Sequence, residues 1–163
     1  MKKQTRLFAA ACLALGLLLP PGAGAADGNG PMPQMLIEVP SPLGFEETLA
    51  KLEENAKALG WKVPGKWKVN FQANLKHVTG IDIGPNQVIK MCAPTPAAQL
   101  LVKDEYKKLT AMMPCTLAVY VKSDGKTYVS MMNLELMGQM YGGDVAEMAR
   151  ELAPQMEAMI KLD

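Results

Sequence analysis

Residues 115–133, CTLAVYVKSDGKTYVSMMN, consist of two β-rich runs on either side of the dipeptide Asp124-Gly125. A two-residue Asp-Gly loop strongly favours a type I′ β-hairpin. Such a loop pairs Val121 with Tyr128, and the alternation of side chains places Cys115 on the same side of the ribbon as Val121. The stretch therefore predicts an antiparallel hairpin.

An amphipathic pattern precedes the hairpin in residues 41–63, SPLGFEETLAKLEENAKALGWKV. Its apolar residues are spaced four, three, four and three positions apart, which places them on one face of a helix. They are Phe45, Leu49, Leu52, Ala56 and Leu59. Gly60 suits the C-terminal end of this helix. We expect Leu52 to occupy a core position.

Further strands and helices are predicted along the chain. MLIEVP (35–40) and NQVIKMCA (86–93) are typical of strands. Thr95 as a cap and Pro96 as first helical residue predict a helix over 96–106. Asp144 and Glu147 form a capping pair for a last helix, which Pro154 should kink or break. The order of elements predicts one α+β domain, with a mainly antiparallel sheet covered by helices.

The amino-terminal residues have the pattern of an export signal. Lys2, Lys3 and Arg6 precede an apolar run over 7–19, and a small-residue cleavage site follows at 23–25. We expect a signal peptide over 1–25, a flexible lead-in over 26–35 and one domain over 36–163. The apolar run is shorter than the roughly 20 residues that a spanning helix needs, so no transmembrane segment is expected. The predicted location is the periplasm, or secretion.

The charge of the chain limits the classes of partner. Without residues 1–25, 14 Lys and Arg remain against 16 Asp and Glu, which gives a net charge of −2. This near-neutral balance argues against nucleic acid or an anionic membrane surface as the main partner. We expect a small ligand or a protein partner, with a second copy of the chain as one alternative.

Four segments, taken in order, resemble one known family. They are PSPLGFEETLAKLEENAKALGWKV (40–63), VIKMCAPTPAAQLL (88–101), MPCTLAVYVKSDGKTYVSMMN (113–133) and LMGQMYGG (136–143). Together they resemble the secreted, two-cysteine branch of the domain of unknown function 302 (DUF302) family. The resemblance implies an α+β fold similar to half of a TATA-box-binding-protein saddle, and it supplies no reaction. The family pattern has an Asn where this chain has Ala93.

Catalytic machinery is not visible in the sequence. His77 is the one histidine of the chain, and it has no Ser or Asp partner at motif spacing. There is no Gly-rich phosphate loop and no C-x-x-C motif. The sequence therefore predicts a non-catalytic binding or accessory protein.

The cysteines are the candidate site. Cys92 ends one predicted strand just before a predicted helix, whose N-terminus would lower the pKa of its thiol. Cys115 begins the next strand, with Met113 two residues earlier and on the same face. Thiolate and thioether ligands suit Cu(I), so Cys92, Cys115 and Met113 form a candidate metal site. A haem held by a cysteine or by His77 is a looser version of the same idea.

Two other chemistries stay open for the same thiols. Cys92 and Cys115 could form one structural disulfide, or they could act as a redox pair. In each case we expect their Cα atoms to lie within about 7 Å. The twelve methionines outside the signal peptide could simply fill the core.

Overall fold

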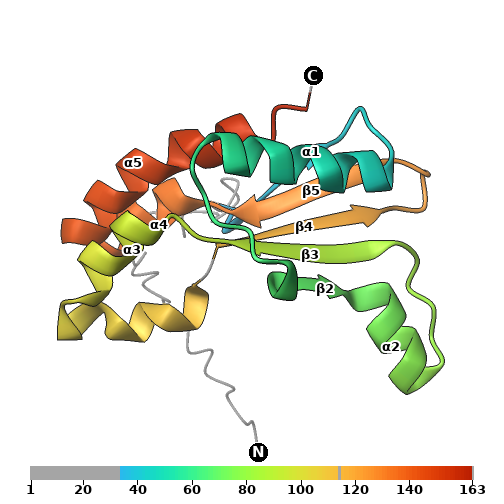
Figure 1. Ribbon diagram of the computed structural model, residues 1–163, viewed down its shortest axis with the longest axis horizontal. Coiled ribbons are helices and arrows are strands. Elements are labelled where there is room, and N and C mark those ends of the chain that lie inside the picture. The colour runs from blue at the N-terminus through green and yellow to red at the C-terminus, as the bar shows by residue number, and fades with distance from the viewer. Residues whose placement is uncertain (1–33, 114, 163) are drawn as a thin grey trace, which may run out of the picture. The chain divides into compact units, whose positions relative to one another are not determined.

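A five-stranded antiparallel sheet in the order β1-β5-β4-β3-β2 organises the computed structural model, which describes residues 34–113 and 115–162 (Figure 1). The strands are β1 (Leu36–Pro40), β2 (Lys68–Asn70), β3 (Asn86–Met91), β4 (Cys115–Val121) and β5 (Thr127–Met132). The helices are α1 (Phe45–Ala58), α2 (Phe71–Thr79), α3 (Pro94–Leu101), α4 (Leu134–Tyr141) and α5 (Gly143–Met159), with 3-10 segments η1 (Gly65–Trp67) and η2 (Asp104–Met112).

The helices confirm the predicted α+β class. Figure 1 shows α1 across one face of the sheet, with α5 continuing the same layer and α2 at the β2 edge. The core lies between the sheet and this layer. Its fully buried side chains include Leu52, Ile89, Leu117 and Val119. Within the described residues, every helix is too short or too polar to cross a bilayer.

The predicted helix over 45–59 is confirmed as α1. Leu49, Leu52 and Ala56 are buried on its inner face, as their spacing indicates. The backbone N–H of Gly44 donates to the Glu47 carboxylate at 3.2 Å, which satisfies one free group at the start of the helix. Gly60 follows the helix with φ of 82°, a left-handed conformation that favours glycine.

The β4–β5 hairpin exists, but its predicted register is wrong by one residue. Val121 pairs with Thr127, not with Tyr128, because the loop is longer than two residues. The N–H of Gly125 donates to the Lys122 carbonyl at 2.9 Å, and Gly125 alone in the loop has positive φ. This is a three-residue loop with glycine in the left-handed position, rather than a type I′ turn that needs two such residues.

The starts of two helices also differ from prediction. α3 is capped by Ala93 and begins at Pro94, two residues earlier than a Thr95 cap would place it. It ends at Leu101, and residues 104–112 form η2 instead of continuing the helix to 106. α5 is capped by Gly142, so Asp144 and Glu147 lie inside the helix and do not form the predicted capping pair.

The α5 helix runs through Pro154, so the break that was one of the two expected outcomes is absent, and the kink stays a prediction. Proline removes one hydrogen bond to the carbonyl four residues earlier, that of Arg150. Both residues are exposed, so water can reach this carbonyl. Leu152 and Met156 are buried on either side of the proline, and their packing against the core favours a continuous helix.

Ala93 leaves the start of α3 without a side-chain cap, so Ala93→Asn should stabilise the protein by about 0.5–1 kcal/mol. The expected gain in the free energy of unfolding is at the low end of the range for helix caps. Pro94 and Pro96 have no N–H group, so the side chain of the introduced asparagine could accept a hydrogen bond only from the Thr95 N–H in this turn. Urea unfolding would measure the change. The matched control is Ala98→Asn inside the helix, which should cost about 0.5 kcal/mol. Equal effects at both positions would contradict the prediction.

The signal peptide and lead-in cannot be compared with the structure. Residues 1–33 lie outside the described part of the chain, so these predictions and the export that they imply stay predictions.

Candidate functional site

A pocket of about 240 Å³ lies at the end of the sheet where β4 begins and β5 ends. Of the fourteen described residues that line it, seven are methionines and one is Cys115. The methionines are Met112, Met113, Met131, Met132, Met137, Met148 and Met156. The other lining residues are Leu36, Leu109, Thr116, Ala118, Ser130 and Leu134. The pocket is therefore apolar and rich in sulfur.

Several separate elements bring these sulfur atoms together. Met113 follows η2, and Cys115 begins β4 two residues later. Met112 ends η2, and Met131 and Met132 end β5. Met137 lies on α4, and Met148 and Met156 lie on α5. The turn from β5 into α4 is fixed by Asn133, whose side chain accepts a hydrogen bond from the Leu136 N–H at 3.0 Å.

Close contact between α4 and α5 shapes the wall of the pocket. A Cβ atom added at Gly138 of α4 would lie 2.6 Å from the Cβ of Ala149 and 3.2 Å from the Cα of Ala146, both on α5. The glycine therefore lets the two helices approach closely, as small residues do at helix crossings. This approach determines where Met137 and Met148 lie beside the sheet.

Cys115 is held as a neutral thiol. Its side chain packs against the core, and burial raises its pKa to about 11, with a further contribution from the nearby Cys92. Burial disfavours the charged thiolate because the apolar surroundings solvate it poorly. Cys115 can therefore ligate a cation that compensates its charge, but it is a weak free nucleophile.

Cys92 lies beside Cys115 but outside the pocket lining in the described residues. Cys115 pairs with Met91, the last residue of β3, so Cys92 directly after that strand is its diagonal neighbour. Strand spacings give roughly 6 Å between the two Cα atoms, but alternation directs the two side chains to opposite faces. Both thiols are free in this structure. The disulfide and the Cα separation stay predictions.

The acidity predicted for Cys92 is wrong in direction. Burial raises the pKa of its thiol, rather than the helix lowering it. Cys92 precedes the Ala93 cap of α3, and its N–H and carbonyl are bonded to the Lys62 backbone at 3.0 and 2.9 Å. The residue is thus part of a β-bridge, and the helix does not offset the loss of water around its sulfur.

His77 lies on the exposed surface of α2, remote in sequence and element from the pocket lining. No group of three or more His, Cys, Asp or Glu side chains in the described residues is arranged to hold a metal ion. The predicted ligands Cys115 and Met113 do line one pocket. The other six methionines were not predicted as site residues, because they come from elements whose packing the sequence pattern does not give.

Comparison with known proteins supports the fold. A family model described as "Domain of unknown function DUF302" matches residues 37–162. A solved structure described as an uncharacterized conserved protein DUF302 from Bacillus stearothermophilus is similar to this chain at a TM-score of 0.68 and 25% sequence identity. The match covers 79% of this chain and 98% of that one. Among curated proteins, none matches the chain.

Proposed function

We propose that this chain, which belongs to the DUF302 family of domains of unknown function, has a non-catalytic role. In this role it binds Cu(I) in the sulfur-lined pocket. The observation that carries the proposal is the gathering of Cys115 and seven methionines around one pocket of about 240 Å³. Thiolate and thioether are the ligands that Cu(I) prefers among protein side chains. The expected export through residues 1–25 is part of the proposal.

The size of the pocket argues against a ligand as large as haem. Pockets for drug-sized molecules measure about 300–1,000 Å³, whereas this one measures about 240 Å³. A haem would need His77 or a cysteine as ligand in a larger space, and His77 lies elsewhere on α2. We therefore prefer the metal ion to haem as the ligand.

The entrance has sulfur atoms that an incoming ion can reach. Met112, Met113, Met132 and Met148 are half-buried, while Met131, Met137 and Met156 are buried. Methionine side chains are unbranched and can turn toward a bound ion at low cost. We propose Cys115 and Met113 as primary ligands, with the neighbouring methionines completing the coordination.

Because the Cys115 thiol is buried, the affinity for Cu(I) should depend on pH. Cu(I) binds the thiolate, so binding at Cys115 must release the thiol proton. Because the pKa of Cys115 is raised to about 11, this proton is present throughout the neutral range. Apparent affinity should therefore rise about tenfold per pH unit between pH 6 and 9, as one proton is displaced per ion.

The test is an anaerobic titration of the reduced protein with Cu(I), in competition with a colorimetric Cu(I) chelator at several pH values. We expect one ion per chain and the pH slope given above. Cys115→Ser should weaken binding at least about a hundredfold at pH 8 and abolish the slope. Met113→Leu, which keeps the volume but removes the sulfur, should weaken binding by a smaller factor.

Two matched variants serve as controls. Met140→Leu removes a methionine that is 65% exposed and outside the pocket lining, so it should leave affinity unchanged. Cys92→Ser tests whether the second thiol is also a ligand. If this variant keeps its affinity for Cu(I), Cys115 is a ligand and Cys92 is not. Absence of Cu(I) binding by the reduced wild-type protein, or a pH-independent affinity that Cys115→Ser does not alter, would refute the proposal.

A thiol redox role is the weaker alternative. Burial raises the pKa of both Cys92 and Cys115, and a thiol that stays protonated attacks disulfides slowly. Cys115 lines the pocket, whereas Cys92 is not among its described lining residues. These features favour a ligand role for Cys115 over reversible exchange with Cys92.

A further inference from the structure

The methionines of the described residues fall into three groups by their exposure to solvent. Met35 and Met140 lie outside the lining of the sulfur-lined pocket and are 43% and 65% exposed. A second group is buried and consists of Met91, Met131, Met137, Met156 and Met159. The third group is half-buried, and every member lines the pocket: Met112, Met113, Met132 and Met148. We name these last four residues the accessible pocket methionines.

Exposure decides which of these thioethers a dissolved peroxide can oxidise. The oxidant must reach the sulfur atom, so a half-buried methionine reacts and a fully buried one is protected. The sulfur lone pair attacks one oxygen of the peroxide, and the O–O bond breaks. One thioether and one hydrogen peroxide thus give one sulfoxide and one water, with the sulfur oxidised by two electrons and the peroxide reduced by two.

The lining of the pocket suits thioethers and does not suit sulfoxides. Among its described residues no side chain is charged, and Thr116 and Ser130 supply the hydroxyl groups. A methionine sulfoxide is polar, so placing it among apolar side chains costs free energy. Its oxygen is also a harder donor than the thioether sulfur that Cu(I) prefers. Oxidation therefore removes a ligand and adds a polar group at the same position.

We propose that the accessible pocket methionines are a modification site, at which oxidation by a peroxide to methionine sulfoxide reversibly weakens Cu(I) binding. This inference rests on the proposed Cu(I) role and adds its regulation. Met113, proposed above as a primary ligand, belongs to the set. Methionine sulfoxide reductases reverse the modification, because a dithiol is oxidised to a disulfide while the sulfoxide oxygen leaves as water.

The Cys115 thiol should respond to peroxide more slowly than the accessible pocket methionines. The thiolate is the reactive form of cysteine, and burial of Cys115 raises the pKa of its thiol to about 11. Thiol oxidation to a sulfenic acid or a disulfide is also reversed by dithiothreitol, whereas a methionine sulfoxide needs its own reductase. The two modifications can therefore be separated in one experiment.

The experiment treats the reduced, metal-free, full-length protein with hydrogen peroxide, removes the peroxide and adds dithiothreitol. Peptide mass spectrometry then locates each added oxygen. The accessible pocket methionines should be oxidised at least about threefold faster than the buried ones. The affinity for Cu(I), measured against the colorimetric chelator, should fall at least about tenfold. Incubation with the two sulfoxide reductases, one for each sulfoxide epimer, should restore it.

Two variants assign the loss of affinity to the pocket. Met35→Leu/Met140→Leu removes the exposed methionines outside the lining, so peroxide should lower its affinity as much as that of wild type. Met113→Leu lacks one proposed ligand before treatment, so peroxide should cause a smaller further loss in this variant than in wild type.

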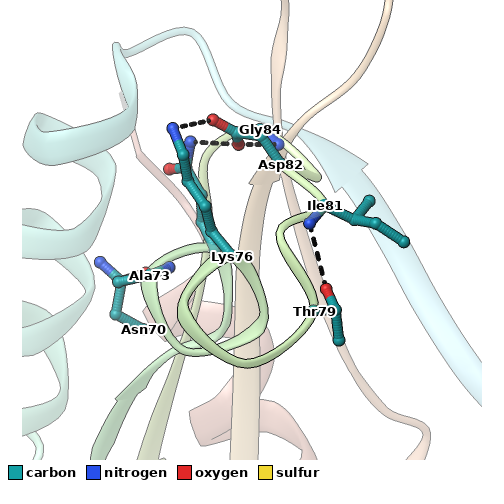
Figure 2. Close-up of polar contacts among 8 residues, drawn as sticks. Asn70, Ala73, Lys76, Thr79, Ile81, Asp82 and Gly84 are labelled. Carbon is teal, nitrogen blue, oxygen red and sulfur yellow. Dashed lines mark hydrogen bonds and ion pairs between the residues drawn. The ribbon is translucent and has the colours of Figure 1, made fainter.

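The α2 helix and its following loop report whether oxidation simply unfolds the protein. Residues 71–84 contain no methionine and no cysteine. The Asp82 carboxylate holds the loop by accepting hydrogen bonds from Lys76 Nζ at 2.7 Å and from the Gly84 N–H at 3.0 Å (Figure 2). Amide hydrogen exchange in this region should stay unchanged after peroxide treatment, because its contacts do not involve sulfur. Global unfolding would accelerate it.

The possible failures are distinguishable. Absence of Cu(I) binding before any peroxide is added would refute the proposed function, and the regulation with it. Undiminished affinity after oxidation of the accessible pocket methionines, or equal oxidation rates at Met113 and the buried Met137, would overturn this inference alone. So would a loss of affinity accompanied by faster hydrogen exchange in α2, because the loss would then result from unfolding.

Discussion

Leu52→Ala is expected to lower the free energy of unfolding by about 2–5 kcal/mol. Leu52 is fully buried at the centre of the inner face of α1, where it belongs to the same core cluster as Ile89 and Leu117 of the sheet. Truncation removes buried apolar area and leaves a cavity that rigid strands cannot close. Urea unfolding followed by circular dichroism measures the loss.

Leu59→Ala provides the comparison for this variant. Leu59 caps the same helix and is 41% exposed, so the same truncation should cost less than about 1 kcal/mol. Equal losses from the two variants would show that the inner face of α1 does not supply the core in the manner described.

Gly138→Val should destabilise the protein by about 3 kcal/mol. The first added carbon would lie 2.6 Å from the Cβ of Ala149, which is closer than two carbon atoms can approach. The α4 and α5 helices must then separate, and overpacking of this kind costs about 1–3 kcal/mol or more. The movement should also widen the sulfur-lined pocket, so Cu(I) affinity offers a second measurement beside unfolding.

A double-mutant cycle separates this clash from general effects of valine in a helix. Ala149→Gly removes the opposing methyl group, so it should recover part of the stability lost in Gly138→Val. The coupling energy should be about 1 kcal/mol or more in favour of the double variant. Gly65→Val is the positional control, because an added Cβ there meets nothing within 4 Å. Additive losses at 138 and 149 would contradict the proposed contact.

The local elements of the fold could be predicted from the sequence because their signals are local. The spacing of Leu49, Leu52 and Ala56 defined α1, and the β-rich runs around Gly125 defined β4 and β5. The register of that hairpin could not be predicted from the Asp-Gly dipeptide. Both loop types accept glycine at position 125, and the choice between them depends on whether Asp124 also takes a positive φ.

The continuation of α5 through Pro154 illustrates another limit of prediction from the sequence. The propensity of proline predicts a break, yet the helix continues because Leu152 and Met156 are buried against other elements. The same reasoning applies to the pocket. Cys115 and Met113 were identifiable as neighbours in sequence, whereas Met137 and Met156 reach the pocket only through the packing of α4 and α5.

The pairing of the first strand with the last has a consequence for the order of folding. β1 joins β5, which lies about 90 residues further along the chain, whereas β4 and β5 are joined by a short loop. We expect the hairpin to form early and β1 to join late, so that Ile37 and Val39 are the last inward-facing strand residues to leave water.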